Sequence, residues 1–340
     1  MSETTSSAPE LKASPGDLAR WAFWVQLRKL VPADKPGRMA AMCKLWPLQQ
    51  LASGNGQRLM MDEYRRCFPD ADPKALASDA YRVAFRVHAE ELLLSTVNEQ
   101  NNTNYMRWEG IENIEKAREA GKGVLLLYPH SGNFMMMIAA LSLQGHKYTQ
   151  FAARGLAPDD VAKANPEVFG HNKWRAEARQ ARHDAEDRLP AVFYNGRPAR
   201  PHLLGCLERN EIVGIAFEGR LGRNFVVKDY LNRKALLAPG PFEMAVESGA
   251  TILPAICWCP PDGPNVTTFG TPIPVAGQAW EPLMDQTLAQ VQPWLRQHSA
   301  GYGIWLLHCL RRAAVDDHPL FIDYAPDDAW RKYIRPGDNL

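Results

Sequence analysis

Residues 123–134 read GVLLLYPHSGNF, and the interpretation of the whole chain starts from this stretch. Gly123 precedes a short apolar run that ends at Tyr128, and a proline follows at once. A short apolar run with turn residues on both sides is typical of a strand buried in the middle of a sheet. The apolar run that begins at Asn133 then predicts a helix. The stretch therefore predicts a strand, a tight turn and a helix, with His130 at the carboxyl end of the strand.

The same alternation of strand and helix continues along the chain. Strand-like runs occupy residues 148–153, 189–194, 211–217 and 251–258, and helical patterns occupy residues 133–143, 173–187, 201–209, 240–248 and 282–298. Alternating units of this kind predict an α/β fold, with a mostly parallel sheet and helices on both of its faces. Such sheets bind ligands beyond the carboxyl ends of their strands.

The first third of the chain has a helical pattern and predicts a helical addition to the α/β fold. A second helix is expected over residues 73–97, which contain no proline or glycine after Pro73. We expect the chain to contain, in order, a flexible tail (1–16), a helical region (17–105), the α/β domain (106–315) and a C-terminal tail (316–340).

Apolar side chains recur at helical spacing from Leu18 through Trp21 to Val25, with basic residues on either side. Two interpretations remain open for this amphipathic helix. It packs on the protein's own core, or residues 18–31 lie on an anionic lipid surface.

The composition excludes several classes of protein. Apolar residues make up 46% and charged residues 23% of the 340 residues, which is ordinary for a globular protein. The net charge of +1 predicts no nucleic-acid partner. The longest apolar stretch is about ten residues, whereas a membrane span needs about 20, so no integral membrane protein is expected. Six cysteines are too few for a disulfide framework and predict reduced thiols in a cytoplasmic protein.

His130 is the residue that best fits a chemical role. It lies beside a helix N-terminus, where backbone N–H groups attract anions, and histidine titrates near neutral pH and therefore suits proton transfer. A purely structural histidine is the alternative. Glu218 closes the run over residues 211–217, and so it is expected at the same edge of the sheet. We find no metal-ligand spacing, no dinucleotide fingerprint and no phosphate-binding glycine loop, so neither a metal nor a cofactor is expected.

The segment around His130 resembles the lysophospholipid acyltransferase superfamily, and most closely its branch of lipid A lauroyl/myristoyl acyltransferases. That branch has a strand followed by His-x-Gly-Asn-aromatic-Glu. The resemblance extends over residues 40–312, and its further blocks lie at 65–69, 108–123, 236–254 and 302–311.

The resemblance implies that His130 is a general base, which deprotonates a hydroxyl or amine of a small-molecule or lipid acceptor. The acceptor then attacks an acyl thioester on an acyl carrier protein or on coenzyme A. The resemblance also implies substrate-binding roles for the turn after His130, for an arginine at a strand end and for a Glu-Gly-x-Arg-like element. In this chain the corresponding substrate-binding residues are Ser131, Gly132, Asn133, Arg154, Gly219 and Arg220. We expect backbone N–H groups of Gly132 or Asn133 to stabilise the oxyanion.

The chain departs from the family pattern at one position. The family has a carboxylate five residues after the histidine, and here that position is Met135. A thioether is too weak an acceptor to orient an imidazole. Glu218 is the first candidate for the missing acid, and a backbone carbonyl or a bound water is the second. A hydrolase with the same site, or a degenerate protein that binds acyl chains or a partner enzyme, remains an alternative to a transferase. Weak contact with the inner-membrane surface is also expected.

Overall fold

A computed structural model of the protein describes residues 12–51, 54–152, 172–194, 198–220, 224–313 and 319–324. The α-helices of this part are α1 (Pro15–Trp21), α2 (Pro36–Cys43), α3 (Trp46–Leu51), α4 (Gly56–Cys67), α5 (Pro73–Glu91), α6 (Glu112–Arg118), α7 (Phe134–Leu143), α10 (Lys173–Glu186), α11 (Ala199–Glu208), α12 (Gly240–Ser248), α13 (Trp280–Gln297) and α14 (Gly303–Arg312). The strands are β1 (Met106–Glu109), β2 (Val124–Tyr128), β3 (Tyr148–Phe151), β4 (Val192–Tyr194), β5 (Ile212–Ala216), β6 (Val226–Tyr230), β7 (Arg233–Leu237), β8 (Thr251–Trp258) and β9 (Asn265–Phe269). Short π and 3₁₀ turns are η1 (Ala22–Gln26), η2 (Leu27–Leu30), η3 (Leu92–Ser95), η4 (Asn102–Asn104) and η5 (Ser299–Tyr302).

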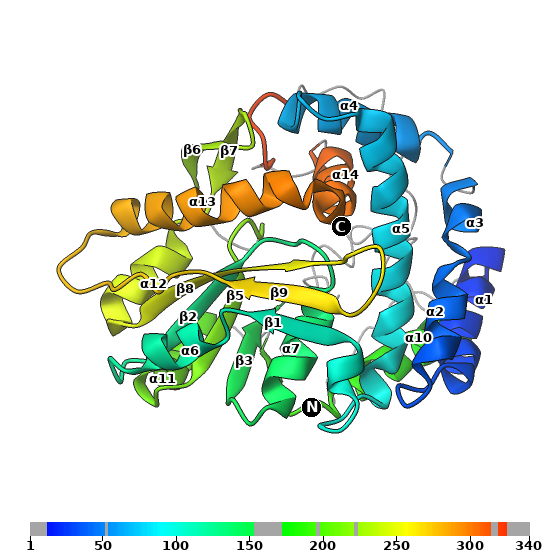
Figure 1. The fold of residues 1–340 in the computed structure, drawn as a ribbon, viewed down its shortest axis with the longest axis horizontal. Helices are drawn as coiled ribbons and strands as arrows, with labels where there is room; N and C mark the ends of the chain where they lie inside the picture. The colour runs from blue at the N-terminus through cyan, green and yellow to red at the C-terminus, as the bar shows by residue number, and fades with distance from the viewer. Residues whose placement is uncertain are drawn as a thin grey trace, which may run out of the picture.

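The predicted α/β fold is confirmed. Within the described residues, seven strands form one sheet in the order β1-β9-β8-β2-β5-β3-β4. All neighbouring strands are parallel except β8 and β9, which are antiparallel. The sequence patterns did not predict β1, β9 or the separate β6–β7 hairpin, which lies at the upper edge of the view in Figure 1.

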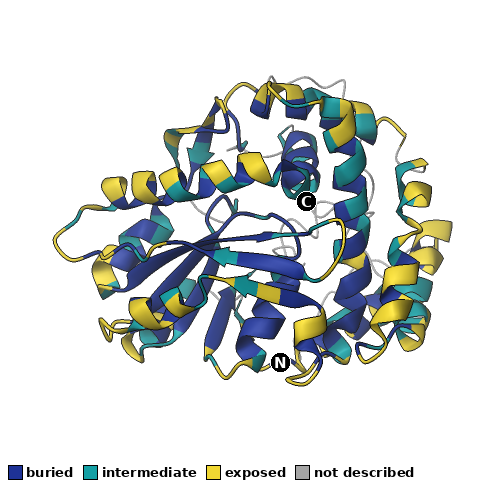
Figure 2. Cartoon of the chain, in the orientation of Figure 1, coloured by how far each residue is buried: buried dark blue, intermediate teal, exposed yellow. Residues whose placement is uncertain are grey.

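The central strands are buried on both faces, as the continuous apolar run of β2 predicts. Leu125 and Leu127 join the core with α4, α11, α12, α13 and α14. Val124, Leu126 and Tyr128 join a second core with α6, α7 and α10. Figure 2 shows the buried strands between helices whose outer sides are exposed. Because side chains alternate along a strand, one five-residue strand supports both cores.

Helix α1 packs on α10, which supports the first of the two interpretations of residues 18–31. The carboxylate of Asp17 lies 2.6 Å from Arg175 Nε, and Trp21 Nε1 donates to Glu177 at 2.6 Å. Burial alone raises the pKa of Asp17, but hydrogen bonds from Ser14, Arg175 and Asn172 outweigh it and hold that pKa well below its ordinary value. No helix in the part of the chain described here is long and apolar enough to cross a bilayer.

Residues 319–324 pack against the β6–β7 hairpin, although they fall in the segment expected to be a tail. The Leu236 N–H donates to the Leu320 carbonyl at 2.8 Å, and the Ile322 N–H donates to the Lys234 carbonyl at 3.1 Å. Phe321 between them is fully buried. The short apolar pair Leu320-Phe321 inside a polar stretch explains the difference, because these two side chains complete the core.

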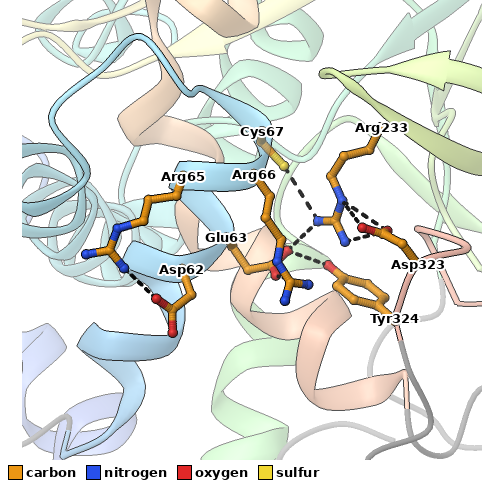
Figure 3. Close-up of polar contacts among 8 residues, drawn as sticks. All are labelled: Asp62, Glu63, Arg65, Arg66, Cys67, Arg233, Asp323 and Tyr324. Carbon is orange, nitrogen blue, oxygen red and sulfur yellow. Dashed lines mark hydrogen bonds and ion pairs between the residues drawn. The ribbon is translucent and has the colours of Figure 1, made fainter.

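Arg233 links three distant segments through a buried ionic cluster (Figure 3). Its guanidinium lies 2.7 Å from Glu63 of α4 and 2.7 Å from Asp323. The second contact of Glu63 is the hydroxyl of Tyr324, which donates at 2.8 Å. Burial raises the pKa of the neighbouring Cys67 thiol to about 12 although Arg233 lowers it, so the thiol stays neutral. The positive charge of Arg233 is therefore balanced by the two carboxylates.

Replacing Arg233 with methionine tests the importance of this cluster. The change removes the buried cation of Glu63 and leaves only the half-exposed Arg66, 3.6 Å away, so we expect a loss of about 3 kcal/mol in the free energy of unfolding, measured by urea denaturation. The matched control is Arg200→Met, because the Arg200–Glu247 pair is about half exposed on both sides. That control should lose no more than about 1 kcal/mol. Equal losses in the two variants would contradict the assignment.

Candidate active site

The pairing of β2 with β5 brings two of the sequence-predicted residues together. The two strands are parallel, and Tyr128 at the end of β2 lies opposite Ala216 at the end of β5. His130 and Glu218 each follow two residues later. Since both strands leave the sheet at the same level, both side chains lie at the same edge.

The imidazole of His130 faces the carboxylate of Glu218. His130 Nδ1 lies 3.5 Å from Glu218 Oε1, and the backbone N–H of His130 donates to the same oxygen at 2.5 Å. The Glu218 side chain is fully buried, whereas 23% of the His130 side chain is exposed. In the described part of the structure, Glu218 Oε2 and His130 Nδ1 are both buried and neither has a hydrogen-bond partner, so the 3.5 Å approach is a close contact and not a formed hydrogen bond. The pair therefore has a buried acid and a partly accessible imidazole, which is the arrangement of a base with an orienting carboxylate.

Aromatic rings fix the plane of the His130 imidazole. The ring of Trp305 on α14 stacks on it, with centroids 3.7 Å apart and an interplanar angle of 14°. Phe134 at the start of α7 meets it edge to face at 5.4 Å. Trp305 was not among the residues predicted from the sequence to form the site. It lies in the block 302–311 that carries part of the family resemblance, and that was the available signal.

The turn after His130 passes very close to β8. Gly132 has φ +58°, and a Cβ atom there would lie 2.4 Å from the carbonyl oxygen of Cys257. The Gly132 N–H donates to the Gly301 carbonyl at 3.1 Å. Burial raises the pKa of Cys257 to about 12, opposed in part by hydrogen bonds from Thr267 and from the Asn133 N–H. Both turn amides are therefore engaged inside the protein, which differs from the oxyanion role expected for them.

Asn133 connects the turn to helix α5. Its side-chain oxygen caps α7 by accepting from the Met136 N–H at 3.0 Å, and its amide group donates to Glu90 at 2.8 Å. The other oxygen of Glu90 accepts from Arg86 at 2.7 Å. All three polar side chains are buried. Glu90 was not predicted from the sequence. The available signal was the spacing of four residues between Arg86 and Glu90 on a helix face that is otherwise largely apolar.

The other predicted substrate-binding residues are placed as follows. Ser131 is fully buried, and the Gly219 N–H donates to the Ala216 carbonyl at 3.1 Å. The guanidinium of Arg220 donates to the Leu236 carbonyl at 2.6 Å and stacks on the Phe225 ring. Arg154 lies outside the described residues. His130 and Glu218 are therefore the predicted pair that the structure brings into direct contact, whereas Arg220 points to the β6–β7 hairpin.

Two shallow grooves, of about 410 and 570 Å³, lie away from this site. They run between α13 and the β6–β7 hairpin, and Asp229, Leu288 and Gln292 line both of them. Among the residues that the structure describes, no group of three or more His, Cys, Asp and Glu side chains is close enough to hold a metal ion.

Comparison with known proteins gives matches to acyltransferases. Residues 63–161, which include His130, match the sequence model of a family described as bacterial lipid A biosynthesis acyltransferase. Phosphatidylinositol mannoside acyltransferase of Mycobacterium tuberculosis strain H37Rv is 26% identical over 192 residues, which are 56% of each chain. The protein of the same name from Mycolicibacterium smegmatis is 27% identical over 153 residues, 45% of this chain and 46% of the relative. The chain thus aligns with about half the length of the curated relatives it matches.

A solved structure also matches, at lower similarity. The 1-acyl-sn-glycerophosphate acyltransferase from Thermotoga maritima aligns with 75% of this chain and 98% of its own, with a TM-score of 0.38 and 12% identity. The family-model match and the curated relatives support a relationship between this chain and the acyltransferase superfamily.

Gly132→Ala tests the close approach of the turn to β8. The new Cβ would both strain the positive φ and meet the Cys257 carbonyl, so we expect a loss of more than about 3 kcal/mol in unfolding free energy. The control is Gly121→Ala, which has φ +67° but nothing within 4 Å of the new Cβ. That control carries the backbone strain alone, about 1–2 kcal/mol. If both variants unfold at the same urea concentration, the close approach of Gly132 to β8 does not contribute to the cost of adding a Cβ atom.

Proposed function

We propose that the protein is an acyltransferase that moves an acyl group from a thioester donor to a hydroxyl or amine group of a lipid acceptor. The observation that carries this proposal is the contact between His130 Nδ1 and Glu218 Oε1 at the carboxyl edge of the sheet. The matches to acyltransferases supply the reaction class, and the name of the curated relatives supplies the lipid class of the acceptor.

In the proposed reaction, Glu218 accepts the Nδ1–H of His130 and so leaves Nε2 as the unprotonated nitrogen. Nε2 removes the proton from the acceptor hydroxyl, and the acceptor oxygen attacks the thioester carbonyl carbon. The tetrahedral intermediate then collapses with cleavage of the carbon–sulfur bond. The departing thiolate takes the proton back from the imidazolium, so protons and electron pairs balance. The 3.5 Å separation shortens as charge develops on the imidazole, because catalytic hydrogen bonds are often long before substrate binds.

Glu218 takes the place of the carboxylate that the family has five residues after the histidine. Met135 at that position lies in the first turn of α7, joins the apolar core and carries no charge. Glu218 approaches the imidazole from the adjacent strand instead, and its Oε1 also accepts the His130 N–H. This backbone contact fixes the carboxylate relative to the residue that it orients.

Both candidate donors, an acyl carrier protein and coenzyme A, present the acyl group on the same phosphopantetheine thiol, so an assay should include both. We further propose the turn residues Ser131 to Asn133, with Arg154, Gly219 and Arg220, as the surroundings of the bound substrates. The engaged amides of Gly132 and Asn133 point to other donors for the oxyanion.

The central prediction concerns the His130–Glu218 pair. His130→Ala should lower kcat/KM for acyl transfer by about 10³-fold or more, because the base is lost. Glu218→Gln should lower it by about 10²-fold, because an amide does not stabilise the imidazolium. Mass spectrometry of the acylated acceptor measures both. His146→Ala is the matched control, since His146 Nδ1 also lies near a glutamate, at 3.9 Å from Glu115, and should keep full activity. Near-full activity of His130→Ala would exclude the proposed base.

The stacking of Trp305 predicts a separate effect on turnover. Trp305→Phe keeps an aromatic face against His130, so we expect kcat within about threefold of the wild type. Trp305→Ala releases the ring and should lower kcat about tenfold or more while KM changes little, because orientation is lost rather than binding. Steady-state kinetics separate the two parameters, and circular dichroism checks the fold. A fall in kcat of equal size in both variants would show that Trp305 does not act by stacking.

A further inference from the structure

The carboxylate of Glu90 joins three segments of the chain in the interior of the protein. Its Oε2 accepts from Asn133 Nδ2 at 2.8 Å and also from the side-chain amide of Asn265, the first residue of β9. Its Oε1 accepts from Arg86 on the preceding turn of α5. Glu90 is only 2% exposed, and both asparagines are fully buried. The three hydrogen bonds offset the cost of burying the charge, and they hold the carboxylate in one position.

Arg86 supplies the positive charge beside Glu90 and attaches a second loop to α5. It donates to the carbonyl oxygens of Pro260, at 3.0 Å, and Gly263, at 2.7 Å, in the connection between β8 and β9. Figure 1 shows this connection, in yellow, against the side of α5. Burial alone lowers the pKa of Arg86, but Glu90 outweighs it and holds that pKa above its ordinary value. The guanidinium therefore stays charged beside the carboxylate.

The side chain of Asn133 bonds a different group at each end. Its Oδ1 caps α7 by accepting the Met136 N–H at 3.0 Å, and its Nδ2 donates to Glu90. An ionised carboxylate only accepts hydrogen bonds, so Glu90 selects the NH₂ end of the asparagine and leaves the oxygen for α7. Glu90 thus determines the orientation of the Asn133 amide, and with it the path of the turn that runs from His130 into α7.

We propose that Glu90 is a positioning residue for His130. It acts through Asn133, three residues further along the chain, and keeps the turn where the imidazole faces Glu218. The two side chains are 3.5 Å apart, so a small displacement of the turn removes this approach. A reacting group misplaced by about 1 Å can cost about 10²-fold in rate. The proposal rests on the proposed function in that the orientation of His130 affects turnover only if His130 is the base.

Glu90→Gln tests the proposal, because it keeps the size of the side chain and replaces one acceptor oxygen with an NH₂ group. That group faces either Asn133 or Arg86, and in both cases a donor meets a donor. We expect kcat for acyl transfer to fall at least about tenfold while KM changes little, because orientation is lost rather than binding. A kcat equal to that of the wild type would contradict the proposal.

Glu186→Gln is the matched control. Glu186 is 4% exposed and lies four residues after Arg182, whose Nε donates to it at 3.1 Å. This pair repeats the spacing and burial of the pair on α5, but it belongs to α10. We expect kcat of the control within about twofold of the wild type.

A double variant separates positioning from a general loss of packing. Glu90→Gln with Asn133→Asp exchanges donor and acceptor between the two side chains and keeps one carboxylate near Arg86. Aspartate still caps α7, and its second oxygen accepts from the new amide. We expect kcat of the double variant to exceed that of Glu90→Gln at least about threefold. A double variant that is folded by circular dichroism but shows no recovery would overturn the proposal.

Chemical modification of His130 gives a readout that does not depend on activity. Diethyl pyrocarbonate modifies accessible imidazole nitrogens, and peptide mass spectrometry follows each histidine separately. Release of the turn should speed the modification of His130 at least about threefold in Glu90→Gln. His146, whose side chain is 16% exposed, is the internal reference. If Glu90→Gln does not fold, Asn133→Ser takes its place, because serine keeps a capping oxygen and removes the contact with Glu90.

The modification assay also separates this proposal from the proposed function. An unchanged rate at His130 in these variants would overturn the positioning role, even if the variants were less active. If the wild type transfers no acyl group from either thioester donor while the rate at His130 still responds to Glu90→Gln, the proposed function is wrong and the positioning of the turn stands.

Discussion

The parallel pairing of β2 with β5 ends at Tyr128 and Ala216. His130 and Glu218 each lie two residues beyond the end of their strand, so the two side chains come to the same edge of the sheet. A shift of one residue in this register would move Glu218 to the other face of the sheet, because side chains alternate along a strand. The register is fixed by burial, since β2 places alternate side chains in two separate cores. The relative position of His130 and Glu218 thus depends on apolar packing in the two cores that β2 joins.

Buried charges attach the remaining segments to this sheet. Glu90 joins α5 to the turn after His130, and Glu63 joins α4 to Arg233 on the hairpin. Each carboxylate has several hydrogen-bond partners, which offsets the cost of removing its charge from water. The two networks lie on α4 and α5, whose small and apolar residues pack on one core. Helices α4 and α5 are therefore each attached to the rest of the protein by a buried carboxylate as well as by apolar packing.

Local patterns were sufficient to predict much of the fold. The strand that ends at Tyr128 and the helix that follows Asn133 were predicted from the local pattern of apolar and turn residues. The rule that parallel strands end at one edge predicted that His130 and Glu218 would lie close together. The hairpin β6–β7 was missed because its strands mix exposed polar with buried residues, and β9 was missed because Thr267 and Asn265 are buried through hydrogen bonds rather than by apolar character. Trp305 and Glu90 reach the site from segments 40 or more residues away from His130 in the chain. No pattern within a short window reports such contacts.

Sequence separation in these contacts has a consequence for biosynthesis. Glu63 and Tyr324 are hydrogen-bonded across a separation of 261 residues, and Trp305 covers His130 from a helix near the same end. A chain emerging from the ribosome therefore leaves His130 without Trp305, and Glu63 without Tyr324, until almost all of the sequence has been made. Contacts of such long range form slowly and late. The edge of the sheet that carries His130 and Glu218 can therefore be completed only after α14 has been synthesised.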